Sequence, residues 1–207
     1  KKRKVVDVLL WEEVFKSSKK RHVGILDLPV VIMAGGKGTR MEPFTKVLPK
    51  PLIPIHEKPV IEHIIERFTN VGVNQFIFTV NYKASIMKAF LEELDPHYSV
   101  EFIEESKPLG TAGSLKFLEN KFDKPLMVTN CDIIIKADYL DLFAFHQNNA
   151  YDITLVASVK NYTIPYGTCE LNEEGHLEKI HEKPEYDFLV NTGLYVINPN
   201  VLKLIPN

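Results

Sequence analysis

A glycine-rich loop that directly follows a short apolar run is the feature that most constrains this chain. The run Val30–Ala34 has the length and the branched residues of a buried strand, and the segment Gly35-Gly36-Lys37-Gly38-Thr39-Arg40 comes immediately after it. Ligands of α/β sheets bind at the carboxyl ends of the strands. Because glycines tolerate positive φ and carry no side chain, successive backbone amides there can converge on an anion. We therefore expect a phosphate-binding loop, with the Arg40 guanidinium as a fixed positive charge.

The spacing of these glycines excludes two common phosphate-binding motifs. A GxGxxG pattern begun at Gly36 meets Met41 where its last glycine should stand, and no GK[ST] triplet follows at the P-loop distance. A plain structural turn remains the alternative interpretation of the Gly-Gly pair. Further along, Pro49 and Pro51 restrict the backbone around Lys50, which predicts a preorganised positive charge. A solvated lysine in a polyproline-like surface loop is the alternative.

Beyond this loop, short runs rich in Val and Ile alternate with stretches of helical periodicity, which is typical of an α/β domain. We expect strands at 30–34, 75–80, 100–104, 126–130 and 153–159. The helical core stripes between them are Ile61, Ile64, Ile65 and Phe68, then Ile86, Ala89, Phe90 and Leu94, then Tyr139, Leu142, Phe143 and His146. Turn signals at 165–167 and 173–175 predict a small antiparallel subregion. The expected architecture is a three-layer, Rossmann-like α/β fold with a mixed, mostly parallel sheet.

Composition and charge limit the classes of partner. With 207 residues and 45% hydrophobic content, the chain can bury a core, which excludes a disordered protein. Its net charge of -2 argues against a general nucleic-acid binder, which needs a basic excess. No apolar run reaches the ~18 residues of a membrane span, and the two cysteines form no metal-binding pair. We expect small-molecule partners, no nucleic acid, no membrane and a cytoplasmic location, and a homo-oligomer is left open.

The segment Met33–Pro54, MAGGKGTRMEPFTKVLPKPLIP, closely resembles the signature of the sugar-phosphate nucleotidyltransferase family. This family contains mannose-1-phosphate guanylyltransferases and glucose-1-phosphate thymidylyltransferases. The resemblance continues through residues 58–61, 107–113, 130–132, 182–184 and 191–195. It implies the nucleotidyltransferase fold and an enzyme that transfers a nucleoside monophosphate from a triphosphate to a sugar 1-phosphate, giving a nucleotide sugar and pyrophosphate.

The resemblance also implies roles for individual residues. The triphosphate would be held by Ala34, Gly35, Gly36, Gly38, Thr39 and Arg40, and the base pocket would include Glu105, Gly110 and Thr111. Asp132 would bind Mg²⁺, since a carboxylate is a hard ligand for a hard cation. The sugar phosphate would be held by Gly167, Glu182, Lys183 and Asn191, with Lys183 on the phosphate. Arg40, Lys50, Asp132 and Lys183 are the expected catalytic residues, because they would neutralise two approaching polyanions.

Structural interpretations of three of these residues stay open. Asp132 at the end of a strand could begin a turn, and Glu182 and Lys183 could form a surface charge pair. Cys131 is interpreted as a buried structural thiol.

Two functions compete with nucleotidyl transfer. A metal-dependent glycosyltransferase usually carries two carboxylates around one residue, where this chain has only Asp132. A non-catalytic module that binds nucleotide sugars would keep the pocket without turnover. Release of pyrophosphate separates these functions. Within the expected reaction, the turn 108–113 looks most like that of guanylyltransferase relatives, which favours GTP with a mannose-type or amino sugar.

The expected domain boundaries leave two stretches to explain. Residues 1–22 contain an apolar run and a polar linker, and the run resembles the tail of a CBS domain, a module that binds adenosine nucleotides. A helix-strand appendage is an equally good interpretation of this segment. The nucleotidyltransferase domain is expected over residues 23–207. Members of the family continue to a second metal-binding aspartate in an Asp-Ile-Gly-like segment, which the sequence does not reach before Asn207. We therefore expect a domain that is truncated at its C-terminus.

Overall fold

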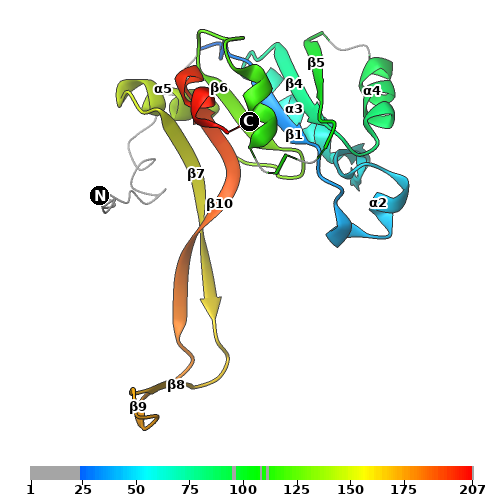
Figure 1. Ribbon diagram of the computed structural model, residues 1–207. Helices are drawn as coiled ribbons and strands as arrows, with labels where there is room; N and C mark the ends of the chain where they lie inside the picture. The colour runs from blue at the N-terminus through cyan, green and yellow to red at the C-terminus, as the bar shows by residue number, and fades with distance from the viewer. Residues whose placement is uncertain (1–23, 95–96, 108, 111, 207) are drawn as a thin grey trace. The chain divides into compact units, whose positions relative to one another are not determined.

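A computed structural model of the chain describes residues 24–94, 97–107, 109–110 and 112–206 (Figure 1). The CBS-like remnant expected in residues 1–22 and the predicted base-pocket residue Thr111 lie outside the described residues. The fold separates into two compact units, each described by itself. The first unit runs to Val156 and resumes at Gly193, and the second unit is Ala157–Thr192.

A six-stranded sheet in the order β5-β4-β1-β6-β10-β7 is the frame of the first unit. The strands are β1 (Val30–Ala34), β4 (Gln75–Val80), β5 (Ser99–Glu104), β6 (Leu126–Asn130), β7 (Ile153–Thr163) and β10 (Glu185–Ile197). Strands β5, β4, β1 and β6 pair in parallel, and β10 runs antiparallel to β6. The mixed, mostly parallel sheet is confirmed, and the expected strands are found, with β5 beginning one residue earlier and β7 continuing to Thr163.

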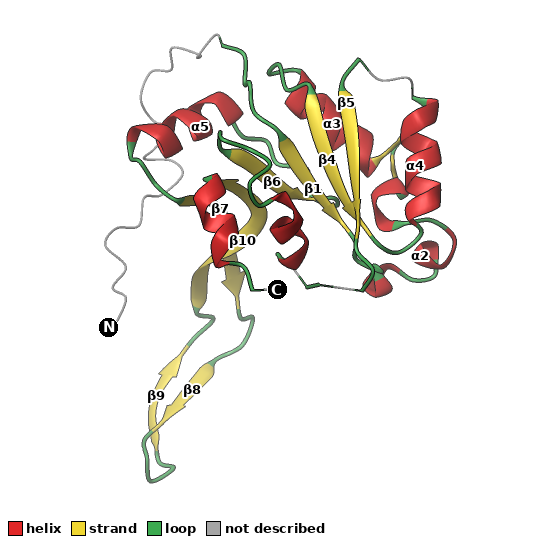
Figure 2. Ribbon diagram, turned by 45° about the horizontal axis from the view of Figure 1, so that its top comes forward, coloured by secondary structure: helices red, strands yellow, loops and turns green. Residues whose placement is uncertain are grey.

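Side chains alternate along these strands and build a hydrophobic layer on each face of the sheet. One layer packs against α3 (Val60–Thr69), α4 (Ala84–Glu93) and α5 (Tyr139–Asn148). The other packs against two short 3-10 helices, η3 (Gly113–Leu118) and η4 (Pro199–Leu204). The sheet between these helices is seen in Figure 2, and the expected three layers are confirmed.

Two of the three helical stripes are confirmed, and one is wrong in phase. The stripe of α3 is buried throughout, and that of α5 is buried or packed against the core. In α4 the buried residues are Met87 and Leu91. Of the predicted stripe, Phe90 packs against the core, whereas Ile86 is 38% exposed and Leu94, just after the helix, is 37% exposed. Both sets have helical spacing, so periodicity identifies the helix but cannot choose between two apolar stripes on it.

The order of the strands creates a crevice at the carboxyl end of the sheet. The chain passes from β1 outward to β4 and β5, and then returns to the opposite side of β1 to form β6. The connections that leave β1 and β6 therefore lead away to opposite sides. Such a switch point is where open α/β sheets bind ligands.

The second unit carries an antiparallel hairpin. Its strands are β8 (Thr168–Leu171) and β9 (Leu177–His181), and the turn between them contains Gly175 at a φ of 82°. The Ile164 amide donates to the Pro184 carbonyl at 3.0 Å, which links the two chain segments that enter and leave the hairpin. The small antiparallel subregion expected from the turn signals is confirmed. Among the described residues, no helix has both the length and the apolar character that crossing a bilayer requires.

We expect Asp138→Ala to lower the free energy of unfolding by about 1 kcal/mol, because Asp138 caps α5. Its Oδ1 accepts hydrogen bonds from the amides of Leu140 at 3.2 Å and Asp141 at 3.1 Å. Urea unfolding followed by circular dichroism measures the loss. Asp138→Asn keeps an acceptor and should unfold at nearly the wild-type midpoint, so equal stability of the alanine variant would show that the cap contributes nothing.

Candidate functional site

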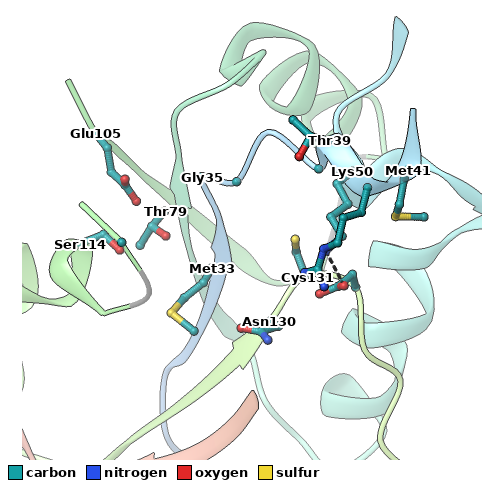
Figure 3. A pocket seen from close by; sticks show the side chains of 15 residues that line it. Met33, Gly35, Thr39, Met41, Lys50, Thr79, Glu105, Ser114, Asn130 and Cys131 are labelled. Carbon is teal, nitrogen blue, oxygen red and sulfur yellow. Dashed lines mark ion pairs between the residues drawn. The ribbon is translucent and has the colours of Figure 1, made fainter. Parts of the chain in front are cut away.

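A cavity of about 670 Å³ opens at the carboxyl end of the parallel strands (Figure 3). It is lined by Met33, Gly35, Gly36, Gly38, Thr39, Arg40, Met41, Lys50, Thr79, Glu105, Gly110, Ser114, Asn130, Cys131 and Asp132. Every described residue of the first unit that the sequence predicts for nucleotide, metal or catalysis lines it, except Ala34. The Ala34 side chain is buried in the core at the end of β1. The structure thus gathers residues from five separate stretches of the sequence around one cavity.

A row of three side chains from neighbouring strands lines the sheet side of this cavity. Met33 on β1 is in register with Thr79 on β4 and with Asn130 on β6. Residues in register on parallel strands point to the same face of a sheet, and adjacent strands lie about 4.8 Å apart. The row therefore crosses the cavity from β4 to β6, as Figure 3 shows.

The glycine loop passes close to other parts of the site at two positions. Gly38 has a φ of 66°, and a Cβ there would lie 2.8 Å from Cγ2 of Thr45 and 3.2 Å from Cβ of Lys50. A Cβ on Gly35 would lie 2.8 Å from Oε1 of Glu105. Only glycine fits such approaches without displacing its neighbours.

Four hydrogen bonds hold the segment that leads from this loop to Lys50. The Thr45 hydroxyl donates to the Gly38 carbonyl at 3.0 Å, and the Tyr82 hydroxyl donates to the Thr45 carbonyl at 3.3 Å. Lys83 Nζ donates to the last two carbonyls of α2 (Phe44–Val47), at 2.5 and 2.6 Å. Side chains that follow β4 thus restrain the chain that follows β1.

Lys50 and Asp132 form an ion pair at one end of the cavity. The distance from Lys50 Nζ to Asp132 Oδ2 is 2.5 Å, and the two side chains are 18% and 30% exposed. Lys50 begins the 3-10 helix η2 (Lys50–Leu52), whose Pro51 and Leu52 are buried. This placement contradicts the alternative of a polyproline-like surface loop. Asp132 stands in a turn just after β6, so it both begins a turn and faces the cavity.

Glu105 lies at the other end of the cavity, with Thr79 and Ser114 (Figure 3). It is 8% exposed, and its Oε2 accepts a hydrogen bond from the Leu109 amide at 3.2 Å. Its carbonyl accepts from Nδ2 of Asn81 at 2.6 Å. A buried carboxylate held in this way is a fixed hydrogen-bond acceptor, because an ionised carboxylate has only acceptor sites.

Cys131 is buried, as the sequence predicts, and it also lines the cavity. Burial, together with the neighbouring Asp132 charge, raises the pKa of its thiol to about 12. Cys169 is exposed.

We expect iodoacetamide at pH 8 to modify Cys169 and to leave Cys131 intact in the folded protein, since the reagent needs an accessible thiolate. Peptide mass spectrometry measures both sites, and equal modification before and after unfolding would contradict the burial of Cys131.

Across the described residues, no three His, Cys, Asp or Glu side chains gather as a metal-binding group. Mg²⁺ is often held by one or two carboxylates together with water and substrate phosphates. Asp132 is a carboxylate of this kind, beside the loop that is expected to hold phosphates. The donor set therefore fits a magnesium ion shared with a bound triphosphate.

The residues predicted for the sugar phosphate all lie in the second unit or on its β10 segment. A Cβ on Gly167 would lie 3.3 Å from Oε2 of Glu182, so these two residues are neighbours. Lys183 follows with a φ of 45°, and Asn191 lies on β10. Gly167, Glu182, Lys183 and Asn191 are exposed. Their role in binding a sugar phosphate stays a prediction.

Several residues of the cavity were not expected there from the sequence: Met33, Met41, Thr79, Ser114, Asn130 and Cys131. One of them had a signal. Thr79 is the only polar residue among the last five of β4, Phe76–Val80, a strand whose other positions there are Phe, Ile and Val. A hydroxyl in such a strand either is bonded locally or faces a ligand. The others have side chains that suit a core or a turn equally well.

Comparisons with known proteins find similar chains. A family model described as "Nucleotidyl transferase" matches residues 29–207. The chain is 38% identical over 185 residues to a mannose-1-phosphate guanyltransferase from Hypocrea jecorina, covering 84% of this chain and 50% of the relative. It is 37% identical over 188 residues to the enzyme of that name from Aspergillus fumigatus, covering 86% of this chain and 51% of the relative. The chain thus spans about half the length of these relatives.

A solved structure has a similar fold. HddC from Yersinia pseudotuberculosis, crystallised in complex with GMP-PN, matches with a TM-score of 0.67 and 26% sequence identity. The match covers 87% of this chain and 80% of that one. It agrees with the mixed, mostly parallel sheet.

Proposed function

Because this chain belongs to the nucleotidyl transferase family, we propose that it transfers a GMP group from GTP to a sugar 1-phosphate and releases pyrophosphate. One observation carries the proposal: the glycine loop, the Lys50–Asp132 pair and the buried Glu105 carboxylate all line a single cavity. The relatives named mannose-1-phosphate guanyltransferase support the choice of GTP and of a mannose-type sugar.

The proposed reaction is an in-line displacement at the α-phosphorus of GTP. An oxygen of the sugar 1-phosphate forms the new bond to phosphorus, the bond to the bridging oxygen of the β-phosphate breaks, and pyrophosphate leaves on the opposite side. The protein supplies no nucleophile. Its residues position two polyanions and neutralise their charge, which is the main task in phosphoryl transfer. Arg40 and Lys50 do this in the first unit, and Lys183 would do it at the sugar phosphate.

Magnesium is the proposed cofactor, held by Asp132 and by phosphate oxygens. When bound, it would withdraw charge from the triphosphate and thereby favour the departure of pyrophosphate. In the structure, Asp132 is paired with Lys50, so Lys50 and the metal ion would both contact the Asp132 carboxylate. Lys50 would thus be placed beside the phosphates that the metal ion binds.

Glu105 supports guanine as the base. Guanine presents a ring N–H and an amino group side by side, and a carboxylate has only acceptor sites for them. Oε2 of Glu105 already accepts from the Leu109 amide, and this bond fixes the orientation of the carboxylate. Gly110, at a φ of 77°, follows Leu109 directly and also lines the cavity.

Pyrophosphate release measured with an enzyme-coupled assay tests the proposed function. The chain is incubated with Mg²⁺, each of GTP, ATP, CTP, UTP and dTTP, and mannose 1-phosphate, with glucose 1-phosphate and an amino-sugar 1-phosphate as alternative acceptors. Release that needs both GTP and a sugar 1-phosphate is the expected result. A glycosyltransferase or a non-catalytic sensor would release no pyrophosphate, and this result from a chain that binds nucleotide would overturn the proposal. A cytoplasmic location, a homo-oligomer and the CBS-like remnant stay predictions.

A further inference from the structure

Thr79 has an unusual hydroxyl group. Its Oγ1 is buried and makes no hydrogen bond within the protein. In the part of the chain that the structure describes, no other buried side-chain oxygen or nitrogen of a non-exposed residue lacks a hydrogen-bond partner. The residue is 1% exposed. A buried hydroxyl without a partner is unfavourable, so such groups are rare in folded proteins. An isosteric valine would avoid this cost in a strand that is otherwise apolar.

The surroundings of Thr79 point to a ligand as the missing partner. Thr79 lines the cavity, in register with Met33 on one neighbouring strand and with Ile103 on the other. Glu105 stands two residues after Ile103, so Thr79 and Glu105 project from the same face of the sheet. Figure 3 shows both side chains at the same end of the cavity, with Ser114 beside them.

The charges of the cavity separate its two ends. Lys50 and Asp132 form an ion pair, and Figure 3 shows Lys50 at the end of the cavity opposite Thr79. The end with Glu105, Thr79 and Ser114 offers two hydroxyl groups and an acceptor carboxylate. That combination suits the polar edge of a nucleobase and does not suit a phosphate.

We propose that the Thr79 hydroxyl hydrogen-bonds the edge of the nucleobase and acts with Glu105 as a specificity-determining residue. This inference rests on the proposed function and deepens it. A hydroxyl both donates and accepts, so it can complement a ring carbonyl or a ring nitrogen that the acceptor-only Glu105 carboxylate cannot satisfy. A site built on such pairing rejects bases that leave its buried groups unpaired. In the free protein the unpaired hydroxyl is energetically unfavourable, and a base that hydrogen-bonds it removes this unfavourable free energy.

Isothermal titration calorimetry of Thr79→Val tests the proposal, with Thr79→Ser as the matched variant that keeps the hydroxyl. We expect Thr79→Val to bind GTP about tenfold more weakly and Thr79→Ser to bind it within about threefold of wild type. Inorganic tripolyphosphate, which has no base, should bind all three proteins equally. The thermal midpoint of Thr79→Val without ligand should equal or exceed that of wild type, because a structural role alone would lower it.

Other results would contradict the proposal for Thr79 or the function on which it rests. If Thr79→Val binds GTP as wild type does, or loses tripolyphosphate affinity to the same extent, the hydroxyl does not read the base. If the tenfold difference disappears with 2′-deoxy-GTP, the partner is the ribose hydroxyl and the assignment to the base is wrong. A folded wild-type chain that binds no nucleoside triphosphate overturns the proposed function, and the inference with it.

Discussion

Replacing Lys50 by methionine should lower the rate of pyrophosphate release by about 10²–10³-fold, with little change in the free energy of unfolding. Methionine keeps much of the length of the side chain but removes the charge that neutralises the reacting phosphates. The ammonium of Lys50 is preorganised by its 2.5 Å ion pair with Asp132 and by the buried Pro51 that follows it. A charge fixed before the substrate arrives stabilises the transition state without reorganisation, which is why its removal should affect turnover most. Steady-state assays with saturating GTP measure the loss.

Lys46→Met is the matched control for this experiment. Lys46 lies four residues earlier, and its side chain is 69% exposed and paired at 3.4 Å with Glu42 on the surface. An exposed pair of this kind contributes little, so Lys46→Met should retain nearly full turnover. Equal turnover in the two variants would remove Lys50 from the mechanism.

Gly38→Ala should weaken GTP binding by at least about tenfold and lower the free energy of unfolding by about 1–2 kcal/mol. The new Cβ would meet Thr45 Cγ2 at 2.8 Å, at a backbone φ of 66° that L-residues rarely adopt. The Thr45 hydroxyl donates a hydrogen bond to the Gly38 carbonyl, and the new Cβ would also lie 3.2 Å from Cβ of Lys50. The substitution should therefore displace both the loop and Lys50. Calorimetry and urea unfolding measure the two effects.

Two other glycines, one in the hairpin turn and one in the same loop, separate backbone strain from loss of the ligand site. Gly175 has a φ of 82° with open space around it, in the hairpin turn, so Gly175→Ala should cost stability without affecting GTP binding. Gly36 lines the cavity, has no protein atom within 4 Å of an added Cβ and has no positive φ. Gly36→Ala should therefore weaken GTP binding and leave unfolding unchanged. Normal GTP binding in both Gly36→Ala and Gly38→Ala would contradict the phosphate-binding role of the loop.

The strand and loop at the centre of the site could be predicted because local sequence determines them. Val30–Ala34 can only be a short buried strand, and the glycines after it need a place where backbone is exposed to a ligand. Lys50 and Asp132 were each predicted to lie in the site. Their direct pairing depends on how β6 returns beside β1, and local sequence does not encode that contact.

Other features needed the tertiary structure. The buried face of α4 depends on which of two apolar stripes meets the sheet, and Met87 rather than Ile86 does so. Strand β10 was not predicted, because residues 185–192 are not buried and show no simple alternation. The orphan hydroxyl of Thr79 is visible only when every neighbouring donor and acceptor is known. Sequence motifs identify residues that a family shares, whereas contacts between residues on different strands can be seen only in the folded structure.

The most direct test of the proposed nucleotide site is equilibrium binding of GTP, ATP, CTP, UTP and dTTP to this chain in the presence of Mg²⁺, measured by calorimetry. The proposed function predicts one site per chain with a clear preference for GTP, and the preference should weaken in Thr79→Val. A folded chain that binds none of the five, or that binds all five equally, would contradict the assignment of the cavity between the glycine loop, Asp132 and Glu105 as a guanine nucleotide site.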